Sequence, residues 1–534
     1  MSIIAVDMTP VLPGGENGGA KILAVELLKS FQGAAPEHQF IIITASWNDD
    51  ELKRLDAPNM SRLCLLRGRE PVPKPSAARY PGRIRRGMGR IRRYVTGVLG
   101  TGTFSGRPLT SRGVDMLFCP FTAPTYAEPG IPTVSVILDL QHRDLPHFFT
   151  PHERELRNAF MEDVKKRADH AICISEYVRQ SVINQLGFDP ERTHAVHVAI
   201  QSRLDTLSDK TAQDLRESLR IDQKPYIFYP ANFWPHKNHA MLLTAYGIFL
   251  SRNPDNDLDL VLTGALEERA QRLKQAVNRM GLKDRVHFLG FLSQDKLEAV
   301  WKGCEFLVFP SLYEGFGIPL VEAMSIGRPI ICSDCTSLPE VAGDAAQYFD
   351  PRIPNEMAAC LEKMVGDTSL RRRLVERGSR RLSDFRLEDM SHNYLRVFHN
   401  ATSSPGRLTE EITGAFHDGW LGQEAVITYG PGPKGRVLEI SLEAPGWLPV
   451  SRIRVSIRGM AGRPVRSGVK RGTVEAFRVP LTEMSGRIYL SLRPTCKPSE
   501  NGLGADERDL SAKIRGCHLL FPEGNRISLM DEKG

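Results

Sequence analysis

Residues 306–341 read FLVFPSLYEGFGIPLVEAMSIGRPIICSDCTSLPEV, and this stretch decides the fold. Its apolar start predicts a buried strand, SLYEGFG predicts a turn, and residues 319–325 predict a helix with a proline in the first turn. Gly315 and Gly317 lack a Cβ, so a ligand can approach the backbone closely. A helix start also presents unpaired N–H groups and a partial positive charge, which suit a diphosphate. The stretch therefore predicts an anion-binding turn between a strand and a helix.

Two carboxylates flank this turn, eight residues apart. Glu314 lies on the loop and Glu322 about one helical turn inside, so one can address a sugar and the other a ribose. Together with Pro339-Glu340 downstream, PSLYEGFGIPLVEAM resembles the Glu-x7-Glu signature of the retaining glycosyltransferases of family 4, which have the GT-B fold. An ordinary strand-to-helix turn, with Glu322 on a solvated helix face, is the alternative, and the longer context favours the resemblance.

The resemblance covers residues 1–400 and implies two facing Rossmann-like domains, a nucleotide-sugar donor, retention at the anomeric carbon and no required metal or other cofactor. It implies that backbone N–H groups of residues 317–320 stabilise the departing diphosphate, where negative charge develops. Glu314 would orient the donor sugar and Glu322 the ribose. A double displacement is not established in the family, so Glu314 is not assigned as a nucleophile. The donor-loop residues carried over are Gly315, Phe316, Gly317, Ile318, Leu320 and Glu322.

The length of 534 residues predicts two to four domains, since one core rarely grows so large. We expect a Rossmann-like acceptor-side domain at 1–200 and a Rossmann-like donor domain at 201–385. A helix at 386–404 would cross back to the first domain, and residues 405–534 would form an all-β, sandwich-like accessory domain.

The N-terminus has no basic region before its short apolar run, and no run of eighteen apolar residues occurs. We therefore expect neither a signal peptide nor a transmembrane helix, and a cytoplasmic protein, peripheral on the inner membrane face if it binds a membrane. The nine cysteines are scattered along the chain, and disulfides between them are improbable in the cytoplasm. Cys332 and Cys335 form a C-x-x-C without a second pair or a histidine cluster, so we expect no metal or redox role.

Residues 2–7 predict a strand, residues 13–19 a glycine-rich turn, and the following residues a long amphipathic helix. This order opens a doubly wound α/β domain, in which such loops bind phosphates. No G-x-G-x-x-G is present, so a dinucleotide site is not predicted. Gly14 and Gly15 match the family's loop near the donor diphosphate and acceptor. A flexible surface turn is the alternative.

The predicted strand at 133–138 ends at Asp139, where ligands bind in open α/β sheets. The family commonly has His-Asp here, whereas this chain has Leu138-Asp139. The resemblance thus carries over Asp139 as a catalytic residue and leaves His142 as an open candidate. Further on, Ser175 is a candidate N-cap for the helix after the strand at 169–174.

The second α/β half opens with a predicted strand at 225–230. Lys237 follows it, and a cation just beyond a strand can hold a diphosphate. The family often has Gly-Arg where Ala231-Asn232 stands, so one phosphate-binding arginine is missing. Asn232 and His236 remain donor-site candidates, His236 as a weaker, proton-dependent donor. A solvated loop lysine is the alternative for Lys237.

The net charge of +7 belongs to one segment, because residues 67–93 hold ten basic residues against one acidic residue. Apolar residues recur there at helical spacing, so residues 79–99 predict a basic amphipathic helix that would bind an anionic membrane surface. A solvated charged loop is the alternative. Without interleaved aromatics, nucleic acid is not an expected partner.

From residue 402 onward, short alternating segments at 436–442, 452–458 and 487–493 are separated by Gly/Pro turns. This pattern predicts antiparallel strands with one solvated face. Trp420 and Trp447 have two open interpretations, as core residues or as platforms for sugars.

The resemblance over residues 1–400 implies a hexosyltransferase, with mannose as one candidate sugar. We expect it to use a glycan or lipid-linked acceptor in cell-envelope polysaccharide synthesis. Its catalytic residues would be Glu314, Asp139 and Lys237. Two other functions stay open. A nucleotide-sugar epimerase would consume donor without acceptor, and a non-catalytic glycan-binding protein would depend on residues 405–534 alone.

Overall fold

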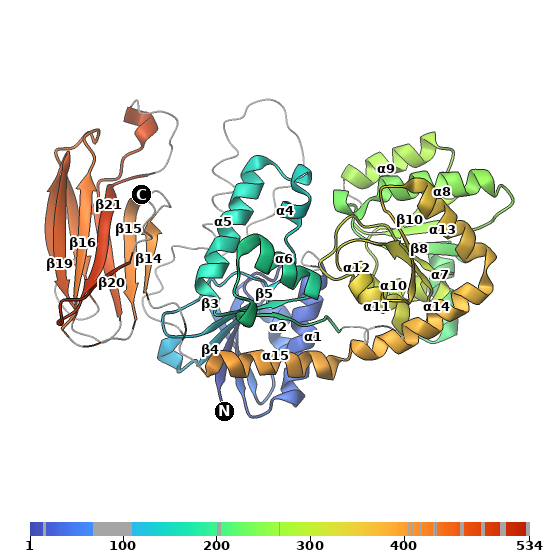
Figure 1. The fold of residues 1–534 in the computed structure, drawn as a ribbon, viewed down its shortest axis with the longest axis horizontal. Coiled ribbons are helices and arrows are strands. Elements are labelled where there is room, and N and C mark those ends of the chain that lie inside the picture. Colours follow the sequence, from blue (N-terminus) through green and yellow to red (C-terminus); the bar gives the residue numbers. More distant parts are fainter. Residues whose placement is uncertain are drawn as a thin grey trace.

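The computed structural model describes residues 1–13, 18–67, 109–199, 206–265, 268–403, 410–415, 419–430, 435–459, 464–481, 486–501 and 509–529, together with Leu204, Gly406 and Pro433. The glycine pair Gly14-Gly15 and the basic segment at 79–99 therefore lie outside the described residues. Three sheets organise the described part of the chain (Figure 1).

The first α/β unit is built on a parallel seven-stranded sheet in the order β3-β2-β1-β4-β5-β6-β7. The sequence patterns predict most of these strands, but not β3. The strands are β1 (Ile3–Asp7), β2 (Gln39–Ala45), β3 (Met60–Leu66), β4 (Met116–Cys119), β5 (Thr133–Ile137), β6 (His170–Cys173) and β7 (Thr193–Ala195). The helices are α1 (Gly18–Ala34), α2 (Asp49–Leu52), α4 (Gln141–Asp144), α5 (Pro151–Arg167) and α6 (Glu176–Leu186).

The second α/β unit has a parallel six-stranded sheet in the order β10-β9-β8-β11-β12-β13. Its strands are β8 (Tyr226–Pro230), β9 (Asp259–Thr263), β10 (Val286–Phe288), β11 (Leu307–Phe309), β12 (Ile330–Ser333) and β13 (Ala346–Phe349). Its helices are α7 (Asp209–Leu219), α8 (His239–Arg252), α9 (Glu268–Arg279), α10 (Gln294–Gly303), α11 (Ile318–Ser325), α12 (Leu338–Ala342), α13 (Pro354–Gly366) and α14 (Thr368–Arg381). Because β8 and β11 are neighbours, the loops at their carboxyl ends lie side by side.

The terminal helix of the α/β part, α15 (Leu387–Thr402), runs from the second unit along the first (Figure 1). It packs on α1, and the hydroxyls of Ser30 and Ser391 lie 2.5 Å apart. Phe398 of α15 packs its ring against those of Phe31 and Phe118 in the first unit. One continuous apolar core therefore spans both α/β units, as expected for two facing Rossmann-like domains joined by a returning helix.

The C-terminal strands form one antiparallel sheet in the order β18-β17-β20-β15-β21-β16-β19. Its edge strands β18 and β19 meet, so the sheet curls into a nearly closed barrel with its own core. The predicted all-β class is confirmed, but as one curled sheet instead of two stacked ones. The strands are β14 (Glu410–Ala415), β15 (Trp420–Tyr429), β16 (Val437–Ala444), β17 (Arg452–Arg458), β18 (Val465–Lys470), β19 (Thr473–Pro480), β20 (Gly486–Arg493), β21 (Ala512–Leu520) and β22 (Arg526–Ser528).

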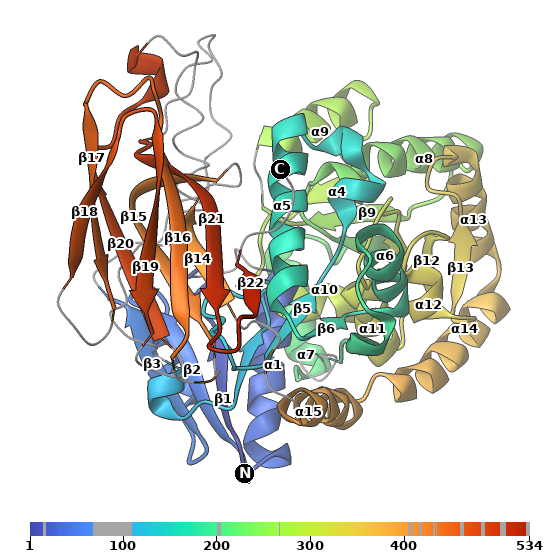
Figure 2. The same ribbon diagram turned by 60° about the vertical axis from the view of Figure 1, so that its left-hand side comes forward.

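The barrel flanks the first α/β unit and lies away from the second (Figures 1 and 2). The rings of Trp420 and Trp447 lie 5.7 Å apart on it and are half-buried, and Trp447 packs on the barrel core. Among the described helices, none is both long and apolar enough to cross a bilayer.

Candidate functional site

The predicted anion-binding turn lies between β11 and α11. Every residue of β11 is buried, and α11 starts at Ile318, one residue before the predicted start. Gly317 caps the helix with φ of +103°, in the left-handed region that favours glycine. A Cβ at Gly317 would also lie 2.7 Å from Leu338 Cδ2. Backbone conformation and packing therefore both require glycine at the helix start.

The two strongest charged candidates meet at this turn. Lys237 Nζ donates to Glu314 Oε1 at 2.5 Å, although the two residues are 77 positions apart in the sequence. Their side chains are only 15% and 12% exposed, so the ion pair is largely withdrawn from water. The Glu314 amide donates to Thr336 Oγ1 (3.1 Å), which fixes the loop beside the pair. Lys237 is thus not a solvated loop lysine.

Hydrogen bonds between the exits of β8 and β11 hold Lys237 in place. The Tyr229 hydroxyl donates to the Lys237 carbonyl oxygen (2.8 Å), and the Leu312 amide donates to the His236 carbonyl oxygen (2.7 Å). Asn238, at φ of +59°, donates its side-chain amide to the carbonyls of Pro310 and Pro351. The lysine therefore projects from a backbone braced on the neighbouring strand.

The other two candidates after β8 carry no positive charge at neutral pH. Burial, followed by the nearby charge of Lys237, lowers the pKa of His236 to about 3, so its imidazole is neutral. The Asn232 side-chain oxygen accepts from the Ala265 amide (3.1 Å) and ties the β8 exit to the β9 exit. Neither residue replaces the cation that the family's arginine would supply.

The remaining donor-loop candidates are mostly buried. Glu322 on α11 is 2% exposed and Leu320 is fully buried. The Phe316 ring packs between those of His197 and Phe385, at 5.8 Å from each. These side chains anchor the loop in the closed arrangement of the two units.

The far side of the donor loop packs directly on the first unit. A Cβ at Gly315 would lie 2.0 Å from the carbonyl oxygen of Leu138, which follows β5. Ser175 Oγ donates to the Gly315 carbonyl oxygen (2.7 Å) and accepts from the Val178 amide, as the predicted N-cap of α6. The Leu140 amide donates to the Tyr313 hydroxyl (3.0 Å). Glycine at 315 is therefore required by the opposing backbone.

A second contact between the units places a carboxylate at the start of α6. Glu340 on α12 accepts from the backbone amides of Glu176 and Tyr177, at 2.7 and 2.8 Å, and from His197 Nε2 at 2.6 Å. Burial opposes the charged form, but the hydrogen bonds from His197 and the two amides outweigh it and lower the pKa of Glu340. The helix N-terminus favours the same negative charge.

The chain is described on both sides of Gly14 and Gly15, which themselves lie outside the described residues. On the incoming side, the Asn48 side-chain amide donates to the carbonyls of Met8 and Val11. On the outgoing side, a Cβ at Gly19 would lie 2.8 Å from Cδ1 of Ile318 in α11. The helix that begins at Gly18 therefore touches the donor loop.

The two candidates after β5 face different surroundings. Asp139 is exposed, and its Oδ1 accepts from the Gln141 amide (3.1 Å). His142 is 3% exposed, with Nε2 3.2 Å from Asn158 Oδ1 and its ring against Phe149. Burial lowers the pKa of His142. Of the two, only Asp139 is accessible in this arrangement.

Asp7 is a buried carboxyl that the sequence patterns did not single out. It ends β1 at the carboxyl edge of the sheet and is 1% exposed. Its Oδ1 accepts from the Thr9 amide and hydroxyl, while Oδ2 has no hydrogen-bond partner in the described part of the chain. Burial raises the pKa of Asp7 to about 6. Its place at the end of an apolar strand was the signal that would have found it.

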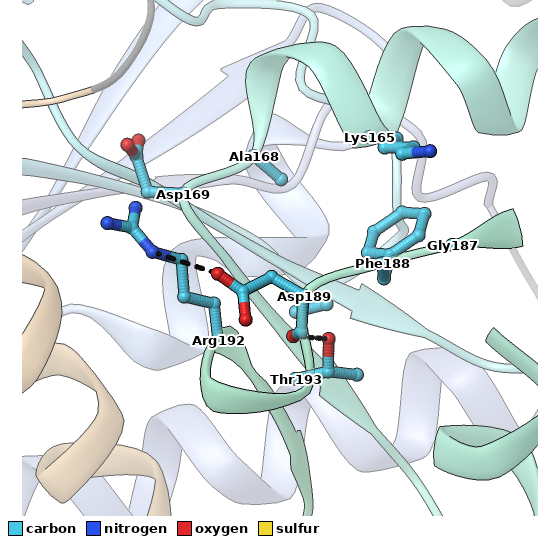
Figure 3. Close-up of a pocket in the computed structure, with 9 residues that line it drawn as sticks. Lys165, Ala168, Asp169, Gly187, Phe188, Asp189, Arg192 and Thr193 are labelled. Atoms are coloured by element: carbon cyan, nitrogen blue, oxygen red, sulfur yellow. Dashed lines mark hydrogen bonds and ion pairs between the residues drawn. The ribbon is translucent and has the colours of Figure 1, made fainter. Parts of the chain in front are cut away.

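A cavity of 170 Å³ elsewhere in the first unit does not belong to this site (Figure 3). It lies at the amino edge of the sheet, where Asp169 and Thr193 stand at the starts of β6 and β7. Its polar groups satisfy one another, since the Thr193 hydroxyl donates to the Asp189 carbonyl and Arg192 pairs with the Asp189 carboxylate. It is a structural gap on the opposite side of the sheet.

Nothing in the described residues forms a metal centre, because no three His, Cys, Asp or Glu side chains gather in a suitable group. All nine cysteines are free thiols. Burial raises the pKa of both Cys332 and Cys335, to about 12 for Cys335, so neither is a ready thiolate ligand.

Comparison with solved structures defines the fold class. Anabaena Alr3699/HepE in complex with UDP-glucose superposes with a TM-score of 0.56 at 16% identity, over 75% of this chain and all of that one. The two α/β units thus have the GT-B fold. The GT-B fold comprises the two α/β units and does not include the C-terminal barrel.

Comparison of sequences adds a family description for the second unit. Residues 211–381 match the model described as "Glycosyl transferases group 1". The O-antigen chain mannosyltransferase B of Escherichia coli is 28% identical over 227 residues, which are 42% of this chain and 59% of that protein. The serotype-specific mannosyltransferase WbdA of Escherichia coli is 27% identical over 258 residues, 47% of this chain and 31% of that protein. The chain thus spans less than two thirds of either relative.

Proposed function

We propose that the chain is a retaining, family-4-like glycosyltransferase that moves a hexose from a nucleotide sugar to a glycan or lipid-linked acceptor. The observation that carries the proposal is the shielded ion pair of Lys237 and Glu314, beside a glycine-capped helix start at the carboxyl edge of the second sheet. The group 1 match covers this unit, and two relatives are named mannosyltransferases, so mannose is the first sugar to test. Cell-envelope polysaccharide synthesis is the context we propose.

The donor diphosphate would sit between Lys237 and the N-terminus of α11. Lys237 is held by a backbone braced on β11, so its charge is positioned before the donor arrives. The dipole of α11 adds partial positive charge at the same place, although Pro319 has no N–H and the Leu320 amide donates to the Gly317 carbonyl oxygen (2.9 Å). Both groups would stabilise the negative charge that develops as the diphosphate leaves. Since His236 is neutral, Lys237 supplies the full positive charge here.

The two glutamates would divide the rest of the donor. Glu314 lies within hydrogen-bond distance of Lys237, so a sugar placed against its carboxylate would have its anomeric carbon near the cation that receives the leaving group. Glu322, one turn inside α11, would take the ribose hydroxyls. Because Glu322 is 2% exposed, it would bind the ribose only after the groups that cover it move aside.

The first unit would supply the acceptor side. Asp139 is exposed beside the closure contacts of Leu138 and Leu140, and the turn with Gly14 and Gly15 leads into the helix that touches Ile318. We assign Asp139 to the acceptor or the donor sugar on this basis. The basic segment at 79–99 would bring this unit to an anionic membrane surface that carries a lipid-linked acceptor, on the cytoplasmic side.

A donor screen tests the proposal. Purified protein is titrated with GDP-mannose, UDP-glucose, UDP-N-acetylglucosamine and dTDP-rhamnose, and binding is followed by calorimetry. We expect one donor to bind to the wild type and to lose most of its affinity in Lys237→Met. The variant Lys302→Met is the matched control, because Lys302 pairs with Glu298 away from the site. Equal binding of every donor to both variants would contradict the donor site.

The product separates the proposal from its two rivals. With donor and acceptor lipids or oligosaccharides, NMR of the product should show the anomeric configuration of the donor. Loss of donor without acceptor, together with release of free sugar or an epimer, would identify an epimerase instead. Glycan binding by the full chain with no affinity for any nucleotide sugar would identify a binding protein.

A further inference from the structure

One face of the C-terminal barrel carries only basic charge on its central strand. Along β17, Arg452, Arg454 and Arg458 are exposed, while the intervening Ile453, Val455 and Ile457 are buried in the barrel core. The alternation follows from the two-residue period of a strand. Three guanidinium groups therefore stand on the same outer surface. Figure 2 places β17 and β18 on the side of the barrel away from the α/β units.

The neighbouring strands extend this charge on both sides. Arg452 stands opposite Lys470 of β18, and Arg454 stands opposite Arg493 of β20. Arg466 of β18 lies opposite Ser456 on the same surface. Like charges directly opposite each other destabilise a sheet. Two such pairs lower the folding stability of the barrel, so a contribution to stability does not explain why these cations are there. We call this surface the basic barrel face, and it consists of Arg452, Arg454, Arg458, Arg466, Lys470 and Arg493.

The other side of the same barrel neutralises its arginines. Arg478 pairs with Glu439 at 2.7 Å, and Arg515 pairs with Glu443. Within the described residues, by contrast, none of the six side chains of the basic barrel face has an ion pair with a carboxylate. The absence of ion pairs is therefore a property of these six cations and not of the barrel, although Glu424 of β15 stands opposite Ser491 on the same surface.

The cations on this face are spread over the sheet surface. A Cβ at Gly468 would lie 2.4 Å from Nε of Arg452, so the glycine leaves room for that guanidinium to lie across β18. Its Nη2 donates to the Gly468 carbonyl oxygen (3.0 Å). The Arg458 guanidinium lies over the ring of Tyr489, 5.4 Å from its centroid. The charges therefore form a two-dimensional array on a convex surface.

We propose that the basic barrel face docks the protein on a bilayer of anionic phospholipids. Arginine binds phosphate oxygens with two parallel hydrogen bonds, and an array over three strands matches headgroups spread in a plane. A glycan chain would need a groove or open aromatic platforms, whereas Tyr489 is already covered by Arg458. This contact is separate from the segment at 79–99 and does not depend on the proposed transferase activity.

Vesicle flotation of the full chain tests the proposal. The protein is mixed with phosphatidylcholine vesicles with and without phosphatidylglycerol, at low and physiological salt. We expect binding only with phosphatidylglycerol. The double substitution Arg454→Ser/Arg466→Ser should weaken it about thirtyfold, since each cation near an anionic surface strengthens binding about fivefold. The matched control Arg478→Ser/Arg515→Ser removes the same charge from two arginines outside the basic barrel face, each paired with a glutamate, and should change binding by no more than about twofold.

Thermal denaturation checks that both variants fold, and loss of the like-charge pair of Arg454 with Arg493 should leave Arg454→Ser/Arg466→Ser at least as stable as the wild type. Equal weakening in both variants would overturn the proposal, because total charge would then explain the binding. An unchanged Arg454→Ser/Arg466→Ser variant would overturn it as well. If the protein does not bind vesicles but binds alginate or a single-stranded oligonucleotide, and this binding depends on Arg454 and Arg466, the bilayer proposal is overturned. The ligand of the face would then be that polyanion.

Discussion

The two α/β units share one architecture but use their strand ends differently. In the second unit, charged side chains meet at the carboxyl edge, where Lys237 and Glu314 form a shielded pair. In the first unit, the groups of the matching edge that contact the donor loop are uncharged backbone and hydroxyl groups, namely the Leu138 carbonyl and Ser175 Oγ, while the carboxylates of Asp7 and Asp139 lie at the same edge. The second unit places a buried ion pair at its edge, and the first unit packs closely against the donor loop through uncharged groups.

This difference separates two ways of losing function. Under the proposed function, a change in the second unit would alter the charge that the leaving diphosphate meets. A change at the seam between the units alters whether the donor loop and the first unit can close on each other. Domain closure completes many active sites, so both kinds of change should reduce turnover for different physical reasons.

The largest effect is expected from closing off the space at Gly315. In Gly315→Ala the new Cβ would meet the Leu138 carbonyl at 2.0 Å, so the units must move apart. A displacement of about 1 Å at an active site can cost a hundredfold in rate, and we expect at least about that loss in kcat/KM. Steady-state kinetics of nucleoside diphosphate release measures it.

Gly366→Ala at the end of α13 is the control, because a Cβ there meets nothing within 4 Å. It should keep wild-type turnover and gain up to about 1 kcal/mol in stability. Full activity of Gly315→Ala would show that the donor loop does not need to approach Leu138.

The next effect concerns the carboxylate that bridges the units. Glu340→Ala leaves the amides of Glu176 and Tyr177 and the His197 ring without their acceptor. We expect the free energy of unfolding at pH 7 to fall by about 3 kcal/mol, as measured by urea denaturation. Glu376→Ala, on the exposed side of α14, should change it by less than about 0.5 kcal/mol.

The stability difference between wild type and Glu340→Ala should also change with pH in a definite direction. The folded pKa of Glu340 is lowered, so its stabilising contribution is present above the unfolded pKa near 4.5 and is lost as pH falls through the folded pKa. The difference between wild type and Glu340→Ala should therefore shrink in acid. A difference that is equal at pH 7 and pH 3 would show that lost packing, and not charge, explains the effect.

A smaller effect of opposite sign is expected at Asp7. Its folded pKa is raised from 3.8 to about 6, so stability falls as pH rises between these values. Asp7→Asn removes this penalty and should raise the free energy of unfolding by about 1 to 2 kcal/mol at pH 7.5. At pH 4 the variant should gain nothing. A gain that is the same at both pH values would contradict the buried, protonatable carboxyl.

Local patterns predicted the donor loop because its structure is local. Strand, glycine turn and helix follow one another within twenty residues, and Gly317 and Pro319 mark the helix start. The meeting of Lys237 with Glu314 was predictable for a further reason. Each follows a strand of a parallel sheet, and the carboxyl ends of neighbouring strands share one edge.

The contacts between the units could not be predicted in the same way. The approach of Gly315 to Leu138, the bond from Leu140 to Tyr313 and the place of Glu340 depend on how two separate sheets face each other. No local pattern encodes that orientation. His142 shows a similar limit, since its spacing after β5 did not reveal that its ring turns into the first unit. The closure of the barrel likewise depends on strands β18 and β19 meeting.

The central claim is that Lys237 and Glu314 act on the donor and do not merely stabilise the fold. Turnover of Lys237→Glu/Glu314→Lys tests it most directly, beside the single variants Lys237→Met and Glu314→Gln. We expect the exchanged pair to restore thermal stability, because opposite charges meet again, while all three variants lose at least about a hundredfold in kcat. Recovery of turnover in the exchanged pair would contradict a role of Lys237 and Glu314 on the donor, because the pair would then serve only to hold the structure.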